Sequence, residues 1–432
     1  TFASELVRKV ANTEKFKGME PSQILLSLTE NPRFWFEVPF IYLAKSGNKQ
    51  IRELLEIPEA TEYARLSDFI TATGAYKIKK QVSEAQKTKI HNKFQTDLIK
   101  IDRRVGLLYS AIGGGILRIY PIPNNEENKW VSQPETLNAG FKGTDSVFVR
   151  QSLPVYLKLL QESKTSQDYT ETNKVLDGIK KFQQKYGSEV IPSQDQIDLE
   201  ISYNKLNVFA KLSKYYGYVS ILLLVFVFLQ IFNEKPWINK VVKVLIGIVA
   251  FLFITHILGL AARGYISGNA PWSNAYESLI FVAAATMLFG LFLGRNSSLT
   301  IAATTFLVSV ILMFAHQNWL DPEIANLQPV LNSWWLYVHV SIIVSSYGPL
   351  SLAMILGIVT LFLILFTTSK NKNKIKLHIK ELTIINEMAI VVGLVMLAVG
   401  NFLGGMWANE SWGRYWGWDP KETWALISIM VY

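Results

Sequence analysis

The positions of apolar and charged residues divide this chain into two parts. Charges recur throughout residues 1–205, and no apolar run there is long enough to cross a bilayer, which needs about 20 residues. From residue 206 onward apolar runs dominate. We therefore predict an all-α protein, with a mainly helical extracytoplasmic domain at 1–205 and a polytopic transmembrane helix bundle at 206–432. Six spans are expected, at 215–232, 240–262, 278–293, 299–315, 335–366 and 384–404, and a truncated seventh from Thr423.

The first domain carries little sign of chemistry. Leu25 and Leu28 recur at helical spacing, which is typical of a helix with one buried face. We find no catalytic motif, and His91, among Lys and Asn on a predicted polar helix, is interpreted as a solvated surface residue. The domain is interpreted as a scaffold. Because the chain opens on Thr1 without Met or a signal peptide and stops inside an apolar run at Tyr432, both ends are expected to be truncated.

Basic residues are distributed unevenly between the two sides of the predicted bundle. One set of alternating loops carries nine Lys and Arg and the other carries three. Since Lys and Arg are enriched in cytoplasmic loops, the first set is predicted to be cytoplasmic. The domain 1–205 and the Trp-rich segment 407–424 are then expected on the periplasmic side of a bacterial inner membrane. The basic set is 233–243, 294–298 and 367–383, and the other is 263–277, 316–334 and 405–422.

The net charge and the absence of cysteine reduce the range of functions that the sequence allows. The net charge of +9 is attributed to membrane orientation, and no nucleic-acid partner is expected. The chain contains no Cys, which excludes disulfides, thiolate metal ligands, a Cys nucleophile and a covalent haem on a Cys-x-x-Cys-His motif of its own.

The Trp-rich segment 407–424 holds five Trp and one Tyr in 18 residues. An interfacial aromatic belt is one interpretation, because Trp is favoured at headgroup depth. The density of indoles with interleaved Gly is more typical of a platform for a large planar apolar ligand, and porphyrin is the obvious candidate. The candidate binding residues are Trp412, Gly413, Arg414, Tyr415, Trp416, Trp418, Asp419 and Trp424.

Some residues of this segment have a second interpretation. The spacing from Asp419 through Pro420 to Glu422 matches an N-cap, a first-turn proline and a capping-box glutamate. We therefore predict that Asp419 and Glu422 begin the seventh helix, a role at least as well supported as ligand binding. Arg414 could pair with a haem propionate or with a lipid phosphate, and the sequence leaves both open.

His339 is the strongest candidate metal ligand among the five histidines. The run 335–366 would reach about 48 Å as a helix, against a hydrocarbon core of about 30 Å. The helix is expected to leave the membrane near Tyr347, with a kink at Gly348-Pro349. His339 then lies on the outer side with the Trp-rich segment, where it could be an axial ligand of haem iron. An interfacial histidine without a ligand is the alternative.

The other histidines are weaker candidates. His256 lies near the outer end of the second predicted span, where a neutral imidazole is tolerated at little cost. His316 ends the fourth predicted span, and His378 is expected to be solvated in a Lys-rich loop.

Three motifs carry a family resemblance. Trp412-Gly-x-x-Trp416-x-Trp418-Asp419-x-x-Glu422-x-Trp424 resembles the WWD signature of haem-handling proteins in cytochrome c maturation. The run from Pro271 to Glu277 resembles the outer-loop motif of the system II branch, the CcsA type. Leu320-Asp321-Pro322-Glu323, followed by Trp335 and His339, fits the same branch. The resemblance covers about 205–432, and the preceding domain fits a fused CcsB–CcsA arrangement.

The resemblance implies a function and a ligand. Proteins of this type export haem b and attach it to apocytochrome c outside the membrane, which would make this chain part of a holocytochrome c synthetase without a conventional catalytic motif. His339 matches one of two outer iron ligands, and His256 matches none of the family histidines. The second outer ligand and a membrane pair would belong to the remaining CcsB and CcsA portions, before Thr1 and beyond Tyr432.

Apocytochrome c and the lipid bilayer are the expected partners. Two other functions stay open, namely a system I relative that exchanges haem with a chaperone and a membrane transporter that binds no haem. The motif from Pro271 to Glu277 favours system II.

Overall fold

The computed structural model describes residues 2–44, 49–232, 235–317, 320, 322–324, 333–368 and 372–432. The chain divides into two compact units, Thr1–Pro192 and Ser193–Tyr432. Both are built from helices, so the predicted all-α class is confirmed. The predicted domain boundary after residue 205 falls near the end of α9 (Gln194–Leu206), which belongs to the second unit.

The first unit is a set of helices around two apolar clusters, with two short two-stranded antiparallel sheets, β1 with β2 and β3 with β4. The larger cluster buries Trp35 and Phe40, and the smaller one buries Tyr120 and Phe182. His91 lies in the turn between α5 and α6 rather than on a helix, and its Nε2 is 3.0 Å from the carbonyl oxygen of Ala85. The elements are α1 (Phe2–Ala11), α2 (Pro21–Glu30), α3 (Pro32–Phe36), β1 (Ile41–Tyr42), α4 (Lys49–Leu55), β2 (Tyr63–Ala64), η1 (Ser67–Phe69), α5 (Lys79–Lys87), α6 (Lys93–Ile112), β3 (Arg118–Pro121), β4 (Trp130–Ser132), η2 (Pro134–Leu137), α7 (Gly143–Ser166) and α8 (Thr170–Gly187).

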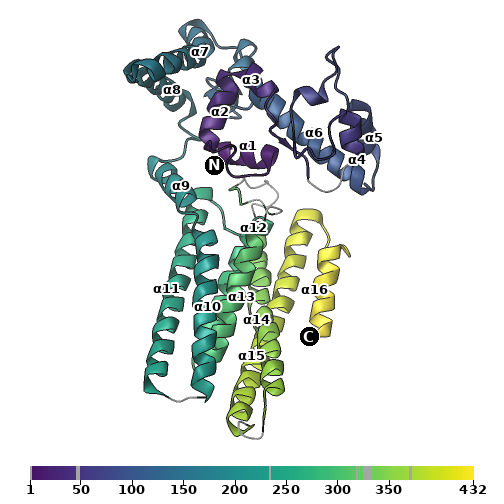
Figure 1. Cartoon of the computed structure of the whole chain (residues 1–432), viewed down its shortest axis with the longest axis vertical. Coiled ribbons are helices and arrows are strands. Elements are labelled where there is room, and N and C mark those ends of the chain that lie inside the picture. The colour runs from purple at the N-terminus through teal and green to yellow at the C-terminus, as the bar shows by residue number, and fades with distance from the viewer. Residues whose placement is uncertain are drawn as a thin grey trace. The chain divides into compact units, whose positions relative to one another are not determined.

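The second unit is a bundle of long helices (Figure 1). Within the described residues, six helical stretches are long and apolar enough to cross a membrane, which confirms the six predicted spans. The chain is therefore a multi-pass membrane protein. After α9 the helices are α10 (Val208–Phe232), α11 (Pro236–Ser267), α12 (Ala275–Leu293), α13 (Ser298–Ala315), α14 (Trp334–Leu365), α15 (Lys372–Trp412) and α16 (Pro420–Val431).

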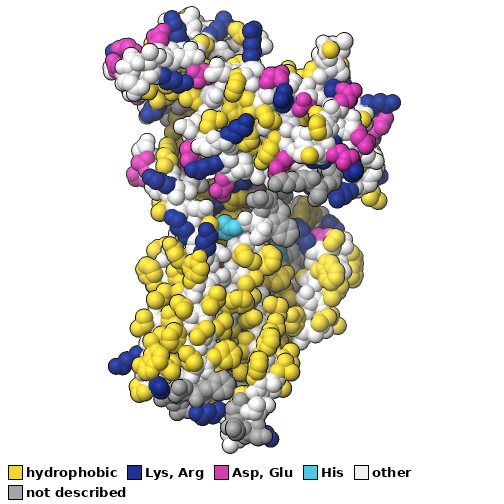
Figure 2. All heavy atoms as spheres, viewed as in Figure 1, with side chains coloured by type: hydrophobic (Ala, Val, Ile, Leu, Met, Phe, Trp, Pro, Cys, Tyr) yellow, Lys and Arg dark blue, Asp and Glu magenta, His cyan; other side chains and the backbone are white. Residues whose placement is uncertain are grey.

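The bundle is apolar on its outside as well as in its core. Phe251, Phe292, Leu361 and Phe402 are all more than 60% exposed, a surface that lipid tails would cover. Figure 2 shows hydrophobic side chains over the visible faces of the bundle, with Lys and Arg near the end where α10 meets α11. Lys370 and Asp321, which entered the loop and motif arguments, lie outside the described residues.

Neighbouring helices pack closely at small residues. α10 packs against α11 and α13, α12 against α13 and α14, and α14 against α15, while α16 lies beside the last part of α15 (Figure 1). A Cβ on Gly348 would come within 2.9 Å of the α12 backbone at Ala285 and Thr286. α14 runs without a break through the predicted kink site, with Pro349 inside the helix. Because it has no side chain, Gly348 therefore allows α14 to approach α12 closely.

Candidate functional site

His339 lies in the second turn of α14 and points toward α15. Its Nδ1 is 2.7 Å from the carbonyl oxygen of Gly400. Because a carbonyl only accepts hydrogen bonds, Nδ1 must carry the proton, which leaves the lone pair on Nε2. In the part of the chain that the structure describes, no hydrogen bond engages Nε2. This is the tautomer in which an imidazole binds a metal through Nε2.

Three glycines of α15 provide the surface on which α14 packs. A Cβ on Gly393 would meet Leu350 Cγ at 2.7 Å, and one on Gly400 would meet Ile343 Cβ at 2.9 Å. A Cβ on Gly404 would meet His339 Cε1 at 2.5 Å. The three contacts follow one another along the two antiparallel helices. The histidine ring therefore packs on the last of three glycines that line one face of α15. Sequence reasoning missed this row, although the seven- and four-residue spacing of the glycines is typical of one helix face.

The Trp-rich segment is part helix and part loop. α15 continues to Trp412, so the segment's first six residues are helical, and the prediction of a loop over 407–424 was wrong there. The helix ends because Gly413 adopts a φ of +69°, and its N–H donates to the carbonyl of Asn409 at 2.9 Å. The segment 413–419 then connects α15 to α16.

The start of α16 contains the predicted cap. Asp419 Oδ1 accepts from the N–H groups of Lys421, at 2.8 Å, and Glu422, at 2.9 Å. The capping-box role expected for Glu422 was wrong, because its Oε2 accepts from the Gly417 N–H at 2.7 Å. Trp418 has a left-handed φ of +55°, so the chain reverses between Gly417 and the cap. The carboxylates of Asp419 and Glu422 therefore shape the loop from both sides.

The aromatic rings of the segment pair edge to face. Trp407 and Trp412 have centroids 4.7 Å apart at 66°, and Trp416 and Trp418 have centroids 5.7 Å apart at 85°. The faces therefore do not form one flat surface. The indole nitrogens of Trp407 and Trp416 are buried, and neither has an acceptor among the described residues. Trp412, Tyr415, Trp418 and Trp424 are each at least half exposed.

Arg414 folds back onto the loop. Its guanidinium lies 6.0 Å from the ring centroid of Trp412 and packs against Gly417, where a Cβ would collide with it. Gly405 connects this loop with the histidine site, because a Cβ there would meet the Tyr415 carbonyl oxygen at 3.1 Å. Two adjacent residues of α15 thus link the two parts of the site. Gly404 contacts His339, and Gly405 contacts the Trp-rich loop at Tyr415.

A buried ion pair at the same end of the bundle was also missed. Arg263 Nε donates to Glu277 Oε1 at 2.7 Å, and both side chains are almost fully buried. The Arg263 guanidinium also donates to the carbonyls of Pro322 and Glu323, at 2.9 and 2.8 Å. Glu277 Oε2 accepts from the N–H and hydroxyl of Ser273, both at 2.7 Å. The motif from Pro271 to Glu277 therefore anchors the connection that follows α13.

The remaining histidines have structural contacts. His316 Nδ1 is 2.8 Å from the Leu312 carbonyl, and His378 Nδ1 is 3.5 Å from Glu381. His256 is fully buried between helices, with Nε2 3.0 Å from the Ile280 carbonyl. In the described ranges, no group of three or more His, Cys, Asp and Glu is placed to hold a metal ion.

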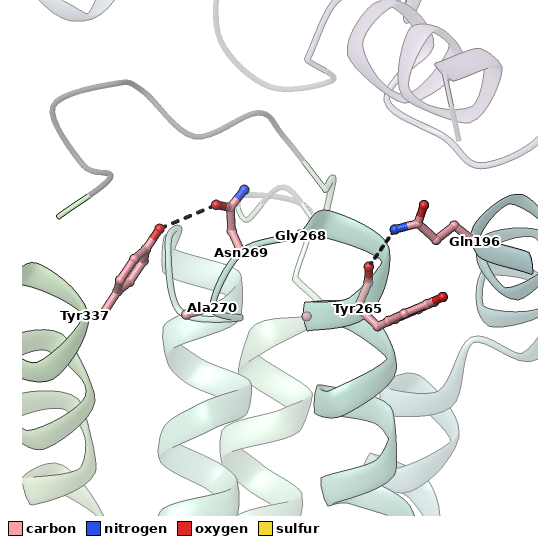
Figure 3. Close-up of a pocket in the computed structure, with 7 residues that line it drawn as sticks. Gln196, Tyr265, Gly268, Asn269, Ala270 and Tyr337 are labelled. Carbon is pink, nitrogen blue, oxygen red and sulfur yellow. Dashed lines mark hydrogen bonds between the residues drawn. The ribbon is translucent and has the colours of Figure 1, made fainter. Parts of the chain in front are cut away.

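A shallow pocket of about 630 Å³ lies between the end of α11 and the start of α14 (Figure 3). Tyr337 donates to Asn269 Oδ1 at 3.4 Å, and Gln196 donates to the Tyr265 carbonyl at 3.3 Å. The side-chain amides of Asn269 and Gln196 therefore already make hydrogen bonds within the second unit. Gly264, Gly268 and Ala270 complete the lining.

The fold and the site define a multi-pass membrane protein with one histidine beside a Trp-rich loop. The sequence model of the family described as "Cytochrome C assembly protein" matches residues 272–432. The chain is 35% identical to protein NrfI of Wolinella succinogenes over 435 residues, which covers 100% of this chain and 47% of NrfI. The match includes both units, consistent with the predicted fused arrangement.

Shorter relatives match the second unit. The chain is 35% identical over 230 residues to the cytochrome c biogenesis protein CcsA of Prochlorococcus marinus subsp. pastoris, covering 47% of this chain and 72% of that protein. It is 37% identical over 201 residues to CcsA of Chlamydomonas reinhardtii, covering 44% and 55%. The chain belongs to the family of CcsA-type cytochrome c biogenesis proteins, and it spans about half the length of NrfI.

Proposed function

We propose that this protein acts in cytochrome c maturation by holding haem b beside His339 and the Trp-rich segment and presenting it to apocytochrome c. Membership of the CcsA-type family supports the maturation role. The observation that carries the haem assignment is the hydrogen bond between His339 Nδ1 and the Gly400 carbonyl. Because this hydrogen bond places the ring proton on Nδ1, the lone pair of Nε2 is available to bind the iron.

The exposed aromatic residues supply the apolar part of the site. Trp412, Tyr415, Trp418 and Trp424 expose between 51% and 71% of their surface. Aromatic faces and edges of this kind can cover a macrocycle that water solvates poorly. The edge-to-face pairs would cover it from more than one direction, and the exposed Arg414 could pair with a propionate.

The chemistry asked of this chain is mainly orientation. Bound haem would supply two vinyl groups, and a thiol S–H of the apocytochrome adds across a vinyl double bond without a leaving group. Holding reactants in register can supply much of the acceleration of such a step. His339 would fix the iron, and the aromatic residues would fix the plane of the ring. The thiols come from the partner, in keeping with the absence of Cys here.

The charge asymmetry of the loops supports a location. With the Lys-rich starts of α11 and α15 in the cytoplasm, His339 and the Trp-rich segment face outward, toward the periplasm of a bacterial inner membrane. Haem attachment would then occur where apocytochrome c arrives.

Haem content of the purified full-length protein tests the proposal. Protein from haem-replete cells should show a Soret band, which the substitution His339→Ala should reduce and added imidazole should restore. His378→Ala is the matched control, because His378 lies beside Glu381 at the opposite end of α15, and should leave the spectrum unchanged. A transporter that binds no haem predicts no Soret band in the unsubstituted protein. Unchanged haem content and ligation in His339→Ala would refute the ligand assignment.

A further inference from the structure

Two neighbouring side chains in the core of the bundle each hold one polar atom that lacks a hydrogen-bond partner among the described residues. Tyr216 of α10 and His256 of α11 are both 0% exposed, and their ring centroids lie 6.2 Å apart. The Tyr216 hydroxyl and the His256 Nδ1 are each buried without a hydrogen-bond partner among the described residues. A buried polar group left without a hydrogen bond destabilises a fold, so two neighbouring ones require an explanation.

The two groups are complementary. His256 Nε2 lies 3.0 Å from the Ile280 carbonyl of α12, so Nε2 must carry the proton and donate. Nδ1 is then an acceptor that needs a donor. The Tyr216 hydroxyl is a donor that needs an acceptor, and it lies on the ring that packs beside the imidazole. No direct hydrogen bond joins them.

The surroundings exclude a large ligand at this point. Phe209 packs edge to face against His256, with centroids 5.4 Å apart, and it is itself buried. Gly259 closes the same region, because a Cβ there would meet Phe209 Cζ at 3.2 Å. A macrocycle could not reach Nδ1 without displacing these rings, whereas a single water molecule needs only the two polar partners and a small gap.

We propose that one buried water molecule bridges the Tyr216 hydroxyl and His256 Nδ1. The water accepts from Tyr216 and donates to Nδ1, so both groups are satisfied. Together with the bond from Nε2 to Ile280, it forms a polar chain that joins α10, α11 and α12. Ionisable groups within membrane spans have specific partners, and here the partner of His256 is water and a backbone carbonyl rather than a metal. The site does not depend on haem.

An experimental structure of the full-length protein in a lipid nanodisc tests the site directly. At a resolution that shows ordered water, a density peak is expected within about 2.7–3.2 Å of both Tyr216 Oη and His256 Nδ1. If the two atoms lie within that distance of each other with no peak between them, a direct hydrogen bond replaces the water and the proposal is overturned.

Two matched substitutions provide a second test. Tyr216→Phe removes the hydroxyl and keeps the ring, while His256→Gln keeps a donor for Ile280 and removes Nδ1. Each is expected to lower the melting temperature by a few degrees, and the double variant should fall no further than the lower single variant, since either change already removes the shared water. Additive losses would show that the groups are independent. None of these readouts requires haem, so failure of the haem assignment leaves them unaffected.

Discussion

His339 and Gly404 are in direct contact across the interface between α14 and α15, with no room for a Cβ between them. The hydrogen bond to Gly400 sets which ring nitrogen is free, and the bare Cα of Gly404 sets where the ring lies. One helix therefore donates the candidate ligand, and the next one orients it. The Trp-rich segment begins on that second helix, so both halves of the site share α15 as a support.

Gly404→Ala should weaken haem binding without removing the ligand. The added methyl would lie 2.5 Å from His339 Cε1, so the ring must turn away from its bond to Gly400. Loss of such orienting contacts typically lowers metal affinity about 10- to 100-fold. Haem titration followed by the Soret band measures the affinity for haem. Gly357→Ala on α14 is the control, because a Cβ there meets nothing within 4 Å. Equal affinity in both variants would contradict a positioning role for Gly404.

Asp419 should stabilise the Trp-rich segment by capping the first turn of α16. Asp419→Ala removes the acceptor for the N–H groups of Lys421 and Glu422, and a lost N-cap costs about 1 kcal/mol. Asp419→Asn retains a capping oxygen and should behave like the unsubstituted protein. Hydrogen exchange of the 417–424 amides distinguishes them, with faster exchange expected only for the alanine variant. If the asparagine variant loses haem while exchange stays slow, the carboxylate has a ligand role that the cap does not explain.

Breaking the pair of Arg263 and Glu277 should destabilise the bundle strongly. Glu277→Gln leaves a buried guanidinium without its counter-charge, and loss of one partner of a buried pair costs about 3–5 kcal/mol. The double substitution Arg263→Met with Glu277→Leu removes both charges and should cost less. Thermal unfolding in detergent compares the stability of the unsubstituted protein, the single variant and the double variant. A single variant as stable as the unsubstituted protein would show that the pair is not buried in the folded protein.

The first unit should show a local pH dependence at Glu135. The backbone N–H of Ser132 and then its hydroxyl, both 2.8 Å from the carboxylate, hold the pKa of Glu135 below its ordinary value of 4.5. Because the folded pKa is the lower one, the contribution to stability is complete above about pH 4.5 and is lost as the pH falls through the folded pKa. Exchange of the Ser132 amide, corrected for intrinsic rates, should quicken at acid pH. The Glu135→Ala variant should exchange quickly at every pH.

Much of the architecture followed from the sequence. Six apolar runs of sufficient length predicted six spans, because a bilayer requires every backbone polar group in a span to be bonded within a helix. The cap at Asp419 was also predictable, since capping depends on residues within one turn. Local rules failed at Glu422, where the left-handed Trp418 redirects the Gly417 N–H toward the carboxylate.

The sequence by itself determined the class of this protein, its membrane spans and the motifs that identify its family. Only the tertiary structure decided that His339 packs on Gly404, that Arg263 pairs with Glu277, and that Tyr216 lies beside His256. Each of these pairs joins different helices. Hydropathy along one helix says which residues lie on a face, but the depth and register at which two helices meet depend on the packing of the whole bundle.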